Sequence, residues 1–573
     1  MQPDDDGGSL PAGSPAARRK RVWRLLNDLA PLGGAVDTVL RSLHRPLLEQ
    51  LPLTPAEWQP AVIGSHAVAG ALKLNCCEAV ACSDAMHAVR DVHSLTLDCH
   101  SESRMEQADE PRLCTAVASL PALRTLRLYG TAGTAHVTAL VPALSRLLRL
   151  AHLDLRTAGV DPAALAPPLA SLTALTALNL DGNSFDADDA AVVAPALSRL
   201  SRLMSLSLAN NSVGKAGAVV LAPSLGLLTT LTALDLGGNE LCTVGVRSLA
   251  PALARLSRLA SLAVSSCAPC DAAAFAPAVV ELTLLTRLTL HSIGAGDAGA
   301  ESIALALSRL SQLANLDLSG WSGTGPDGAV ALAAHLGLLT ALTALNISNL
   351  MFGAAGAESF APVLGRLTEL ASLDLASLDL RGAGAATLAP HLSGLTALTL
   401  LTLSFNYITS TGMEAFAPVL ACLSRLASLG LRDNDIGDAG AAALAAPLRH
   451  LTALTALDLS ENYFGPTGAQ LLAPALSGLS HLVQLSLRLN TVGVAGAAAL
   501  APSLGGLATL TFLDLSETDI GSAGTEHLAA ALARLTALQE LCLLSAEDDE
   551  FVACAMCDAV PYSVWEVSDL SRL

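Results

Sequence analysis

Hydrophobic residues recur along this chain in a pattern whose period changes within each repeat. The segment from Leu451 to Leu479, LTALTALDLSENYFGPTGAQLLAPALSGL, contains the whole pattern. In LTALDLSEN the leucines alternate with other residues, as in a strand that buries one face. After the Asn, apolar residues recur every three or four positions, as on one face of a helix. The pattern predicts a strand, a turn and a helix in each copy.

Copies of this segment follow one another through most of the chain. The second Leu of the LxL pattern measures their spacing, and fourteen clear copies place it at Leu180, Leu208, Leu236, Val264, Leu290, Leu318, Ile347, Leu375, Leu403, Leu431, Leu459, Leu487, Leu515 and Leu543. The interval is 28 residues almost throughout, with one of 26 from Val264 to Leu290 and one of 29 from Leu318 to Ile347. Weaker copies precede them at Leu74, Leu97, Leu128 and Leu155. Such repetition indicates a solenoid whose units pack on their neighbours.

Glycine and proline recur at fixed places in the helical half. A Gly six residues after the Asn suits close packing at the start of the helix, as at Gly440 and Gly468. A Pro recurs further along, as at Pro447 and Pro474. Because proline removes one helical hydrogen bond, we expect each helix to kink or end there.

The pattern LxxLxLxxN followed by a helix, at a period of 28 residues, resembles the leucine-rich repeat of the ribonuclease-inhibitor type. The resemblance is strong over residues 120 to 546 and weak over residues 67 to 120. It implies an α/β solenoid in the form of a horseshoe, with parallel strands on the concave face and helices on the convex face. It also implies that the Asn of each turn, here called the ladder position, bonds backbone groups. That role falls on Asn183, Asn211, Asn239, Asn406, Asn434, Asn462 and Asn490, with Cys267 as a tolerated substitute.

The ladder positions of the middle copies hold apolar residues, namely Ile293, Trp321, Leu350 and Leu378. These copies lie near the intervals of 26 and 29 residues. Two interpretations stay open. In the first, the sequence has drifted and apolar side chains fill the turn. In the second, a local change of curvature makes residues 288 to 380 a distinct binding segment.

The two ends of the chain depart from the repeat. Residues 1 to 21 begin acidic and rich in Gly and Pro, lack a secretion signal, and are expected to form a disordered leader. Residues 22 to 66 predict a helical cap, or else a separate module that binds an adaptor. The solenoid is expected over residues 67 to 546, degenerate to about residue 170 and regular after it. Residues 547 to 573 are expected to cap its other end.

Composition narrows the classes of function. The 573 residues are 52% hydrophobic and 14% charged, with a net charge of −19. No apolar run is long enough to predict a transmembrane helix. The negative charge argues against binding of nucleic acid, which needs clustered Lys and Arg. The basic run Arg18 to Arg21 is either a nuclear-import patch or a solvated lead-in to a helix, so we expect a cytoplasmic protein, with the nucleus as the alternative compartment.

Patterns that resemble cofactor or metal sites are explained by the repeat. Gly294, Gly296 and Gly299 fit the GxGxxG dinucleotide pattern, with Asp317 downstream. Other copies have the same turn without the extra Gly, so no cofactor is predicted. Cys and His gather between residues 76 and 114, but their spacings match no zinc finger, so no metal site is predicted. Because the sequence contains no phosphate loop, HExxH or GxSxG pattern, no catalytic residue is predicted.

Polar positions on the predicted concave face are the candidates for partner binding. They are His291, Asp317, Trp321, Asp374, Arg432, Asp458, Arg488 and Asp514. An open sheet with Asp at a consensus position offers no closed pocket in which a catalytic carboxylate could have a raised pKa. We therefore expect a non-enzymatic scaffold that binds a protein partner. Trp321 is the one aromatic anchor expected on this face.

Two other functions stay open. Ran-type GTPase-activating proteins are also built from repeats of this type, which would make a small GTPase the partner. Their long acidic tail is absent here, where the acidic run is EDDE, residues 547 to 550. The GxxGAxxLA units are also similar to those of bacterial effectors with an N-terminal F-box. Residues 22 to 66 would then bind a Skp-type adaptor of a ubiquitin ligase, although they do not spell a convincing F-box.

Overall fold

A computed structural model of the chain describes residues 67–68, 71–75, 92–98, 110–120, 122–129, 135–265 and 272–543. The predicted leader and both predicted caps lie outside these residues, as does Cys267. The chain divides into two compact units, Met1–Asn239 and Glu240–Leu573, which are described in turn. The repeat pattern predicts one uninterrupted run of copies and contains no signal for a division at this point.

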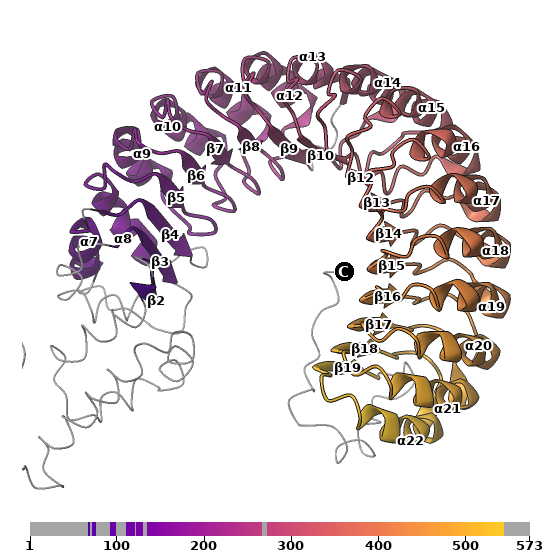
Figure 1. Ribbon diagram of the computed structural model, residues 1–573. Helices are drawn as coiled ribbons and strands as arrows, with labels where there is room; N and C mark the ends of the chain where they lie inside the picture. The colour runs from indigo at the N-terminus through magenta and orange to yellow at the C-terminus, as the bar shows by residue number, and fades with distance from the viewer. Residues whose placement is uncertain are drawn as a thin grey trace, which may run out of the picture. The chain divides into compact units, whose positions relative to one another are not determined.

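The first unit alternates short strands with helices. Its described strands are β1 (Ala67–Val68), β2 (Ala71–Asn75), β3 (Ser94–Asp98), β4 (Thr125–Tyr129), β5 (His152–Asp154), β6 (Ala177–Asn179), β7 (Ser205–Ser207) and β8 (Ala233–Asp235). Its described helices are α7 (Glu110–Ala118), α8 (Ala135–Leu144), α9 (Pro162–Ser171), α10 (Ala187–Leu197) and α11 (Gly214–Leu225). β1 pairs with β2 antiparallel, and β2 to β8 pair in chain order as parallel neighbours. The strands form one side of this unit and the helices the other (Figure 1).

The second unit repeats this arrangement. Its described strands are β9 (Ser261–Ser265), β10 (Arg287–His291), β11 (Asn315–Asp317), β12 (Ala344–Asn346), β13 (Ser372–Asp374), β14 (Leu400–Thr402), β15 (Ser428–Gly430), β16 (Ala456–Asp458), β17 (Gln484–Ser486), β18 (Phe512–Asp514) and β19 (Glu540–Cys542). Its described helices are α12 (Cys242–Leu253), α13 (Ala276–Val279), α14 (Gly296–Leu307), α15 (Pro326–Leu336), α16 (Gly353–Leu364), α17 (Arg381–Leu392), α18 (Thr409–Leu420), α19 (Gly437–Leu448), α20 (Pro466–Leu476), α21 (Gly493–Leu504) and α22 (Gly521–Leu532), with a 3-10 turn, η2, at Ala272–Ala274.

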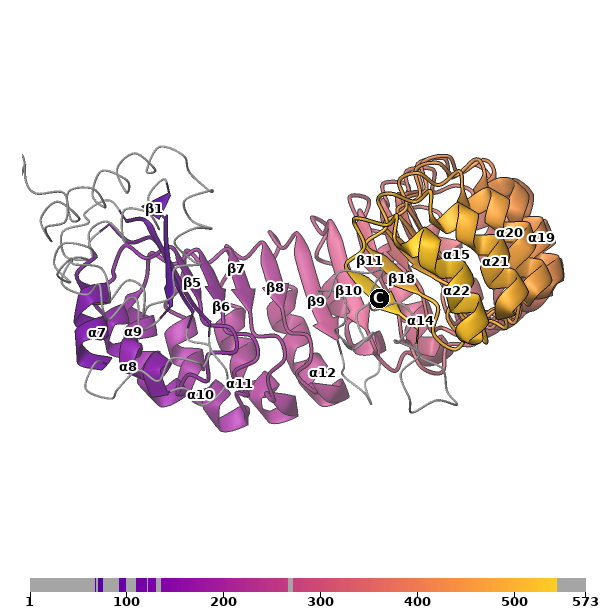
Figure 2. The same ribbon diagram turned by 90° about the horizontal axis from the view of Figure 1, so that it is seen from below.

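All neighbouring strands from β9 to β19 pair in parallel and in chain order. Within this unit the strands lie on the inner side of an arc and the helices on its outer side (Figure 1). The helices α19 to α22 lie side by side when the unit is viewed from below (Figure 2). The predicted α/β solenoid, with parallel strands on one face and helices on the other, is therefore confirmed within each unit.

The leucines of neighbouring strands stay in register through the irregular intervals. Leu288 pairs with Leu262 across the interval of 26 residues, and Leu345 pairs with Leu316 across the interval of 29. The short copy loses its residues from the helical half, where η2 and the four-residue α13 replace a full helix. Variation in repeat length is thus absorbed outside the sheet.

Buried leucines form the core of each repeat. In the copy that begins at Leu451, the strand leucine Leu457 is 2% exposed and the helix leucine Leu476 is 0% exposed. Burial of such a side chain contributes about 1.5–3 kcal/mol, so stacked copies build a continuous apolar layer. The helix of this copy, α20, ends two residues after Pro474, whose carbonyl accepts a hydrogen bond from the Ser477 hydroxyl at 2.9 Å. This agrees with the prediction that helices kink or end near the recurrent proline.

The asparagines at the ladder position join consecutive repeats. Asn434 is 0% exposed, and its Nδ2 donates to the carbonyls of Leu403 at 3.0 Å and Leu431 at 2.9 Å. Its Oδ1 accepts from the backbone N–H of Asn406 at 3.1 Å. The same donations recur at the other six asparagines, although among the described residues the buried Oδ1 of Asn239 has no hydrogen-bond partner.

Trp321 has a structural role instead of the predicted role in partner binding. Its side chain is 0% exposed, and its Nε1 donates to the carbonyl of Leu290 at 2.5 Å. Leu290 lies 31 residues before Trp321, the same separation as that of Leu403 from Asn434. The indole thus makes the donation that an asparagine makes elsewhere, and the prediction of an exposed anchor is wrong. The other apolar ladder residues, Ile293, Leu350 and Leu378, are buried as well.

Two carboxylates join the start of one helix to the start of the next. Asp438, in the first turn of α19, accepts from the backbone N–H groups of Gly465 at 2.7 Å and Gly468 at 2.8 Å. Asp297, in α14, makes the same two bonds to the start of α15. The first N–H groups of a helix have no partner within the helix, and a carboxylate there also complements the helix dipole. In these two places the neighbouring repeat supplies the helix cap.

Replacement of Asn462 by Ala should lower the free energy of unfolding of the second unit by about 2–4 kcal/mol, because several buried backbone groups lose their partner. Urea unfolding followed by circular dichroism measures the change. Thr491→Ala, at an exposed position of the next turn, serves as the control and should cost less than about 0.5 kcal/mol. Equal effects of the two substitutions would contradict the stabilising role of the ladder.

Asp438→Ala should destabilise the second unit by about 1 kcal/mol, because α20 loses the acceptor for two N–H groups. The control is Glu414→Ala, which removes an exposed carboxylate in the preceding helix α18 and should leave the unfolding midpoint nearly unchanged. Hydrogen exchange should show faster exchange at Gly465 and Gly468 in the first variant. Unaltered exchange at both glycines would count against the cap.

Candidate functional site

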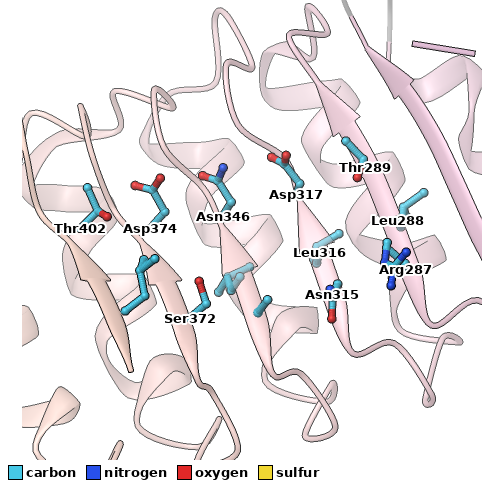
Figure 3. Close-up of a pocket in the computed structure, with 13 residues that line it drawn as sticks. Arg287, Leu288, Thr289, Asn315, Leu316, Asp317, Asn346, Ser372, Asp374 and Thr402 are labelled. Carbon is cyan, nitrogen blue, oxygen red and sulfur yellow. The ribbon is translucent and has the colours of Figure 1, made fainter. Parts of the chain in front are cut away.

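A groove of about 350 Å³ crosses the inner face of the second unit over β10 to β14. Four polar side chains on consecutive strands, Asp317, Asn346, Asp374 and Thr402, form a row along it and point to the same side (Figure 3). A second row holds Arg287, Asn315 and Ser372 (Figure 3). Four of the five strands, β10 to β13, belong to the copies whose ladder positions hold apolar residues, and the copy of β14 has Asn406 there.

Alternation along each strand places this row on the open face. Asp374 lies between Leu373 and Leu375, which are both 0% exposed. Because successive side chains of a strand point to opposite faces, burial of the two leucines directs Asp374 away from the helices. The same argument applies to the central residue of each LxL pattern.

Backbone hydrogen bonds hold the row in place. In three of its four members a side-chain oxygen accepts from the N–H of the residue two positions later. The distances are 2.9 Å from Ser319 to Asp317, 3.0 Å from Ser348 to Asn346, and 3.0 Å from Ala376 to Asp374. Sequence reasoning missed this bond, although an Asp or Asn before a turn is a known signal for it. The polar row therefore has a fixed orientation before any partner binds.

The electrostatics of the groove are dominated by two carboxylates. Burial raises the pKa of Asp374 above its ordinary value of 3.8, and the charge of Asp317 raises it further. The hydrogen bond from Ala376 opposes both effects. Ionised Asp374 is thus less stable in the folded chain than in water, and a cation in the groove would relieve this cost.

His291 is joined to Asp317 by a hydroxyl. The Ser319 hydroxyl donates to Oδ1 of Asp317 at 2.5 Å, and Nδ1 of His291 lies 2.7 Å from the same hydroxyl oxygen. Since the one hydroxyl proton goes to the carboxylate, Nδ1 of His291 is the donor to the Ser319 oxygen. Nε2 of His291 lies 2.9 Å from the hydroxyl oxygen of Ser292.

These hydrogen bonds from Asp317 to Ser292 resemble those that activate a catalytic serine. The neighbouring backbone N–H groups, however, do not supply the oxyanion hole of such a site. The N–H of Ser292 donates to the carbonyl of Ser319 at 2.8 Å, and that of Gly320 donates to the carbonyl of Ser348 at 2.9 Å. These two N–H groups are therefore engaged and do not form an oxyanion hole. The network holds His291 next to Asp317, at the edge of the groove.

The other predicted residues of the face lie further along the second unit. Arg432 pairs with Glu461 at 2.5 Å, and Arg488 pairs with Glu517 at 2.7 Å, so both charges are matched within the chain. Asp458 accepts from the N–H and hydroxyl of the serine two positions later, at 3.0 and 2.5 Å. None of these three residues lines the groove.

Asp514 is not available to a partner, and its prediction as a binding residue is wrong. It is 1% exposed, because its strand β18 is buried on both faces, with Leu513 at 0% and Phe512 at 9%. Burial is the main cause that raises the pKa of Asp514, and hydrogen bonds from Ser516 oppose it.

The first unit has a smaller hollow, of about 170 Å³, over β4 to β7. Arg156 lies in it and pairs with Asp154 through two bonds of 3.1 and 2.8 Å. Its guanidinium also lies 5.7 Å from the ring centre of Tyr129. The charges of Arg156 and Asp154, which line this hollow, are therefore already paired with each other. The larger groove of the second unit is the stronger candidate for a partner-binding site.

Metal-ligating residues do not gather within the described part of the chain. No group of three or more His, Cys, Asp or Glu side chains placed to hold a metal ion occurs there. Of the Cys and His cluster between residues 76 and 114, only His93 and Cys114 fall within the described residues. No described helix has both the length and the apolar character needed to span a bilayer.

Asp374→Asn should raise the melting temperature of the second unit at pH 7. Folding raises the pKa of Asp374, so the folded chain binds its proton more tightly than the unfolded chain does, and ionisation at neutral pH lowers stability. Asn can keep the bond to Ala376, as Asn346 does with Ser348. The gain should shrink as the pH falls through the raised pKa towards 3.8.

Thermal unfolding of both chains between pH 3.5 and 8 measures the effect. Asn346→Asp, which adds a carboxylate between Asp317 and Asp374, is the reverse variant and should lower stability at pH 7. A gain for Asp374→Asn that is the same at pH 4 and pH 7 would contradict an ionisation effect.

The family model described as Leucine Rich repeat matches five segments of the chain, residues 228–250, 426–445, 450–473, 478–501 and 506–529. The crystal structure of an internalin from Listeria monocytogenes is similar, with 18% identity, 76% of this chain and 89% of that chain covered, and a TM-score of 0.34. TLR13 in its complex with ssRNA13 is similar at 19% identity, over 75% of this chain and 54% of that chain, with a TM-score of 0.42. Neither likeness bears on what this chain binds. No curated protein matches the sequence.

The matched segments coincide with strand, turn and helix copies of the fold. Their leucines lie in the core and their asparagines bond the backbone of the preceding copy. Assignment to the ribonuclease-inhibitor type stays a prediction from the period and the turn sequence. The chain is a leucine-rich repeat protein.

Proposed function

We propose that the chain is a non-enzymatic scaffold that binds a protein partner in the groove over β10 to β14. The observation behind this proposal is the row of polar side chains whose orientation the backbone already fixes. Side chains held in place lose little conformational freedom on binding, so less of the interaction energy is spent on ordering them. Leucine-rich repeat folds commonly mediate protein–protein interaction, which agrees with this use of the face.

The open form of the groove favours a protein over a small molecule. Five strands at a spacing of about 4.8 Å span roughly 20 Å, and the sheet continues beyond them on both sides. Small-molecule pockets bury about 70–90% of their ligand, which an open strand face does not do. A standard interface needs about 800 Å² on each partner, which the groove and the neighbouring strands together can supply.

The charges of the groove indicate the chemistry of the partner. Asp317 and Asp374 lie along its length, and Arg287 lies at one end. A partner surface with hydrogen-bond donors and a mild positive charge would complement the carboxylates. It would also lower the raised pKa of Asp374 by stabilising the ionised form.

Several predictions from the sequence are kept within this proposal. The predicted caps at residues 22 to 66 and 547 to 573 lie outside the described residues and stay predictions, and residues 288 to 380 are the proposed binding segment. The cytoplasm is the expected compartment. The backbone N–H groups of Ser292 and Gly320, beside His291, are already bonded and so do not form an oxyanion hole.

Arginine substitutions in the groove should abolish partner binding. Ser372→Arg combined with Thr402→Arg fills the groove and reverses its charge, so a partner recovered with the unmodified chain should bind at least about tenfold more weakly. Affinity purification followed by titration of the recovered partner measures the loss.

The matched control is Ser428→Arg combined with Gln484→Arg, two half-exposed strand positions outside the groove. It adds the same charge to the same unit. Circular dichroism and thermal unfolding first establish that both variants are folded. Full binding by the groove variant would overturn the proposal, and so would an equal loss in the control.

A further inference from the structure

Exposed aromatic side chains gather on one edge of the second unit. Phe405, Tyr407 and Tyr463 are 40%, 52% and 67% exposed, and Met351 on the same edge is 71% exposed. Among the described residues, every other Phe, Tyr and Trp side chain is buried or half-buried. We call these four residues the aromatic rim. Clustering of this kind is unusual, because large apolar side chains on a surface are normally scattered singly.

Three residues of the rim, Met351, Tyr407 and Tyr463, lie in the turns, one position after a ladder position. In five successive repeats the residue after the ladder position is Met351, Asp379, Tyr407, Asp435 and Tyr463, so bulky apolar and acidic side chains alternate. The strands β12 to β16 before these turns pair in register. Successive members are therefore about 5 Å apart and alternate members about 10 Å apart.

The backbone conformation at these positions does not favour bulky side chains. Met351, Tyr407 and Tyr463 have φ of 53°, 50° and 54°, in the left-handed region. Gly, Asn and Asp tolerate this region best, and the intervening repeats do have Asp there. These bulky side chains therefore destabilise the fold, and because they are exposed, packing does not offset the destabilisation.

The chain already contains a cation bound on the rim. The guanidinium of Arg432 lies 5.4 Å from the ring centre of Phe405, and its Nε donates to Glu461 at 2.8 Å. An aromatic face and a carboxylate together form a favourable site for a guanidinium or ammonium group. Among the described residues, no cation is stacked on the rings of Tyr407 and Tyr463, although Arg381, which is paired with Asp379, lies close enough to Tyr407 to interact with it electrostatically.

Negative charge exceeds positive charge on this part of the rim. Arg381 pairs with Asp379 at 3.0 Å, and Arg432 pairs with Glu461. Asp433 and Asp435 lie between the two tyrosines, and burial raises the pKa of Asp433, with the charges of Glu461 and Asp435 as further causes. A cation placed here would meet both ring faces and excess carboxylate.

We propose that the aromatic rim binds a cationic segment of a protein partner, with Arg or Lys side chains stacked on Tyr407 and Tyr463 and paired with Asp435. An extended segment rises about 3.3 Å per residue, so basic residues three apart match the spacing of the two tyrosines, about 10 Å. The rim is a different surface from the groove, so this inference goes beyond the proposed function and does not depend on it.

The test uses the full chain and a fluorescein-labelled peptide with Arg at every third position and Gly elsewhere. Fluorescence anisotropy at low and moderate salt measures its affinity, and the same peptide with Glu in place of Arg should not bind. Tyr407→Ala combined with Tyr463→Ala should weaken binding at least about tenfold. Tyr407→Phe combined with Tyr463→Phe should restore most of it, because the ring face is retained. Unchanged affinity of the alanine variant would overturn the proposal.

Two variants that remove the same charge distinguish binding at the rim from a general attraction of the basic peptide to an acidic protein. Asp435→Asn should weaken binding severalfold. Asp519→Asn changes the same position of a later repeat, also exposed but without flanking tyrosines, and should have little effect. Equal losses in both variants would overturn the proposed site. The groove variants address a different partner surface, so failure of either proposal leaves the other standing.

Discussion

The side-chain amide of a buried asparagine is the interaction that joins most of the regular repeats to one another. It satisfies carbonyls of its own turn and of the preceding repeat, where a tight turn leaves them without a strand partner. Buried polar groups without such partners are costly, so the bond determines where one turn lies against the next. Tyr407, Asp435 and Tyr463 of the rim each follow one of these asparagines, so the ladder sets the spacing of rings and carboxylate there.

The middle repeats show that the turn can be built in more than one way. Trp321 keeps the donation across repeats and adds a large apolar volume, whereas Leu350 and Leu378 contribute only apolar volume. The strands of these repeats still pair in register. Loss of the amide is therefore compensated by packing, and the groove lies over the repeats where this replacement has occurred.

Much of the fold could be predicted because its signals are local and repeated. The alternation of leucines located the strands, the three-to-four spacing located the helices, and the recurrent Asn located the turns. The two wrong predictions concern side chains whose burial depends on contacts with neighbouring repeats. Trp321 was predicted to be exposed because aromatic residues are rare, but its position beside Leu290 is a contact between repeats. Asp514 follows the same consensus as Asp374, and only its buried strand distinguishes the two. The aromatic rim was missed because its members lie 28 residues apart and align only after the repeats stack.

The shared cap at Asp438 has a consequence for how such a chain can change in length. The acceptor belongs to one repeat and the two donors belong to the next, so the structural module does not coincide with a single copy of the sequence. A copy inserted between them would separate acceptor from donors unless it supplied an Asp at one end and a compatible glycine turn at the other. Gain or loss of repeats is then easiest at boundaries without this bond.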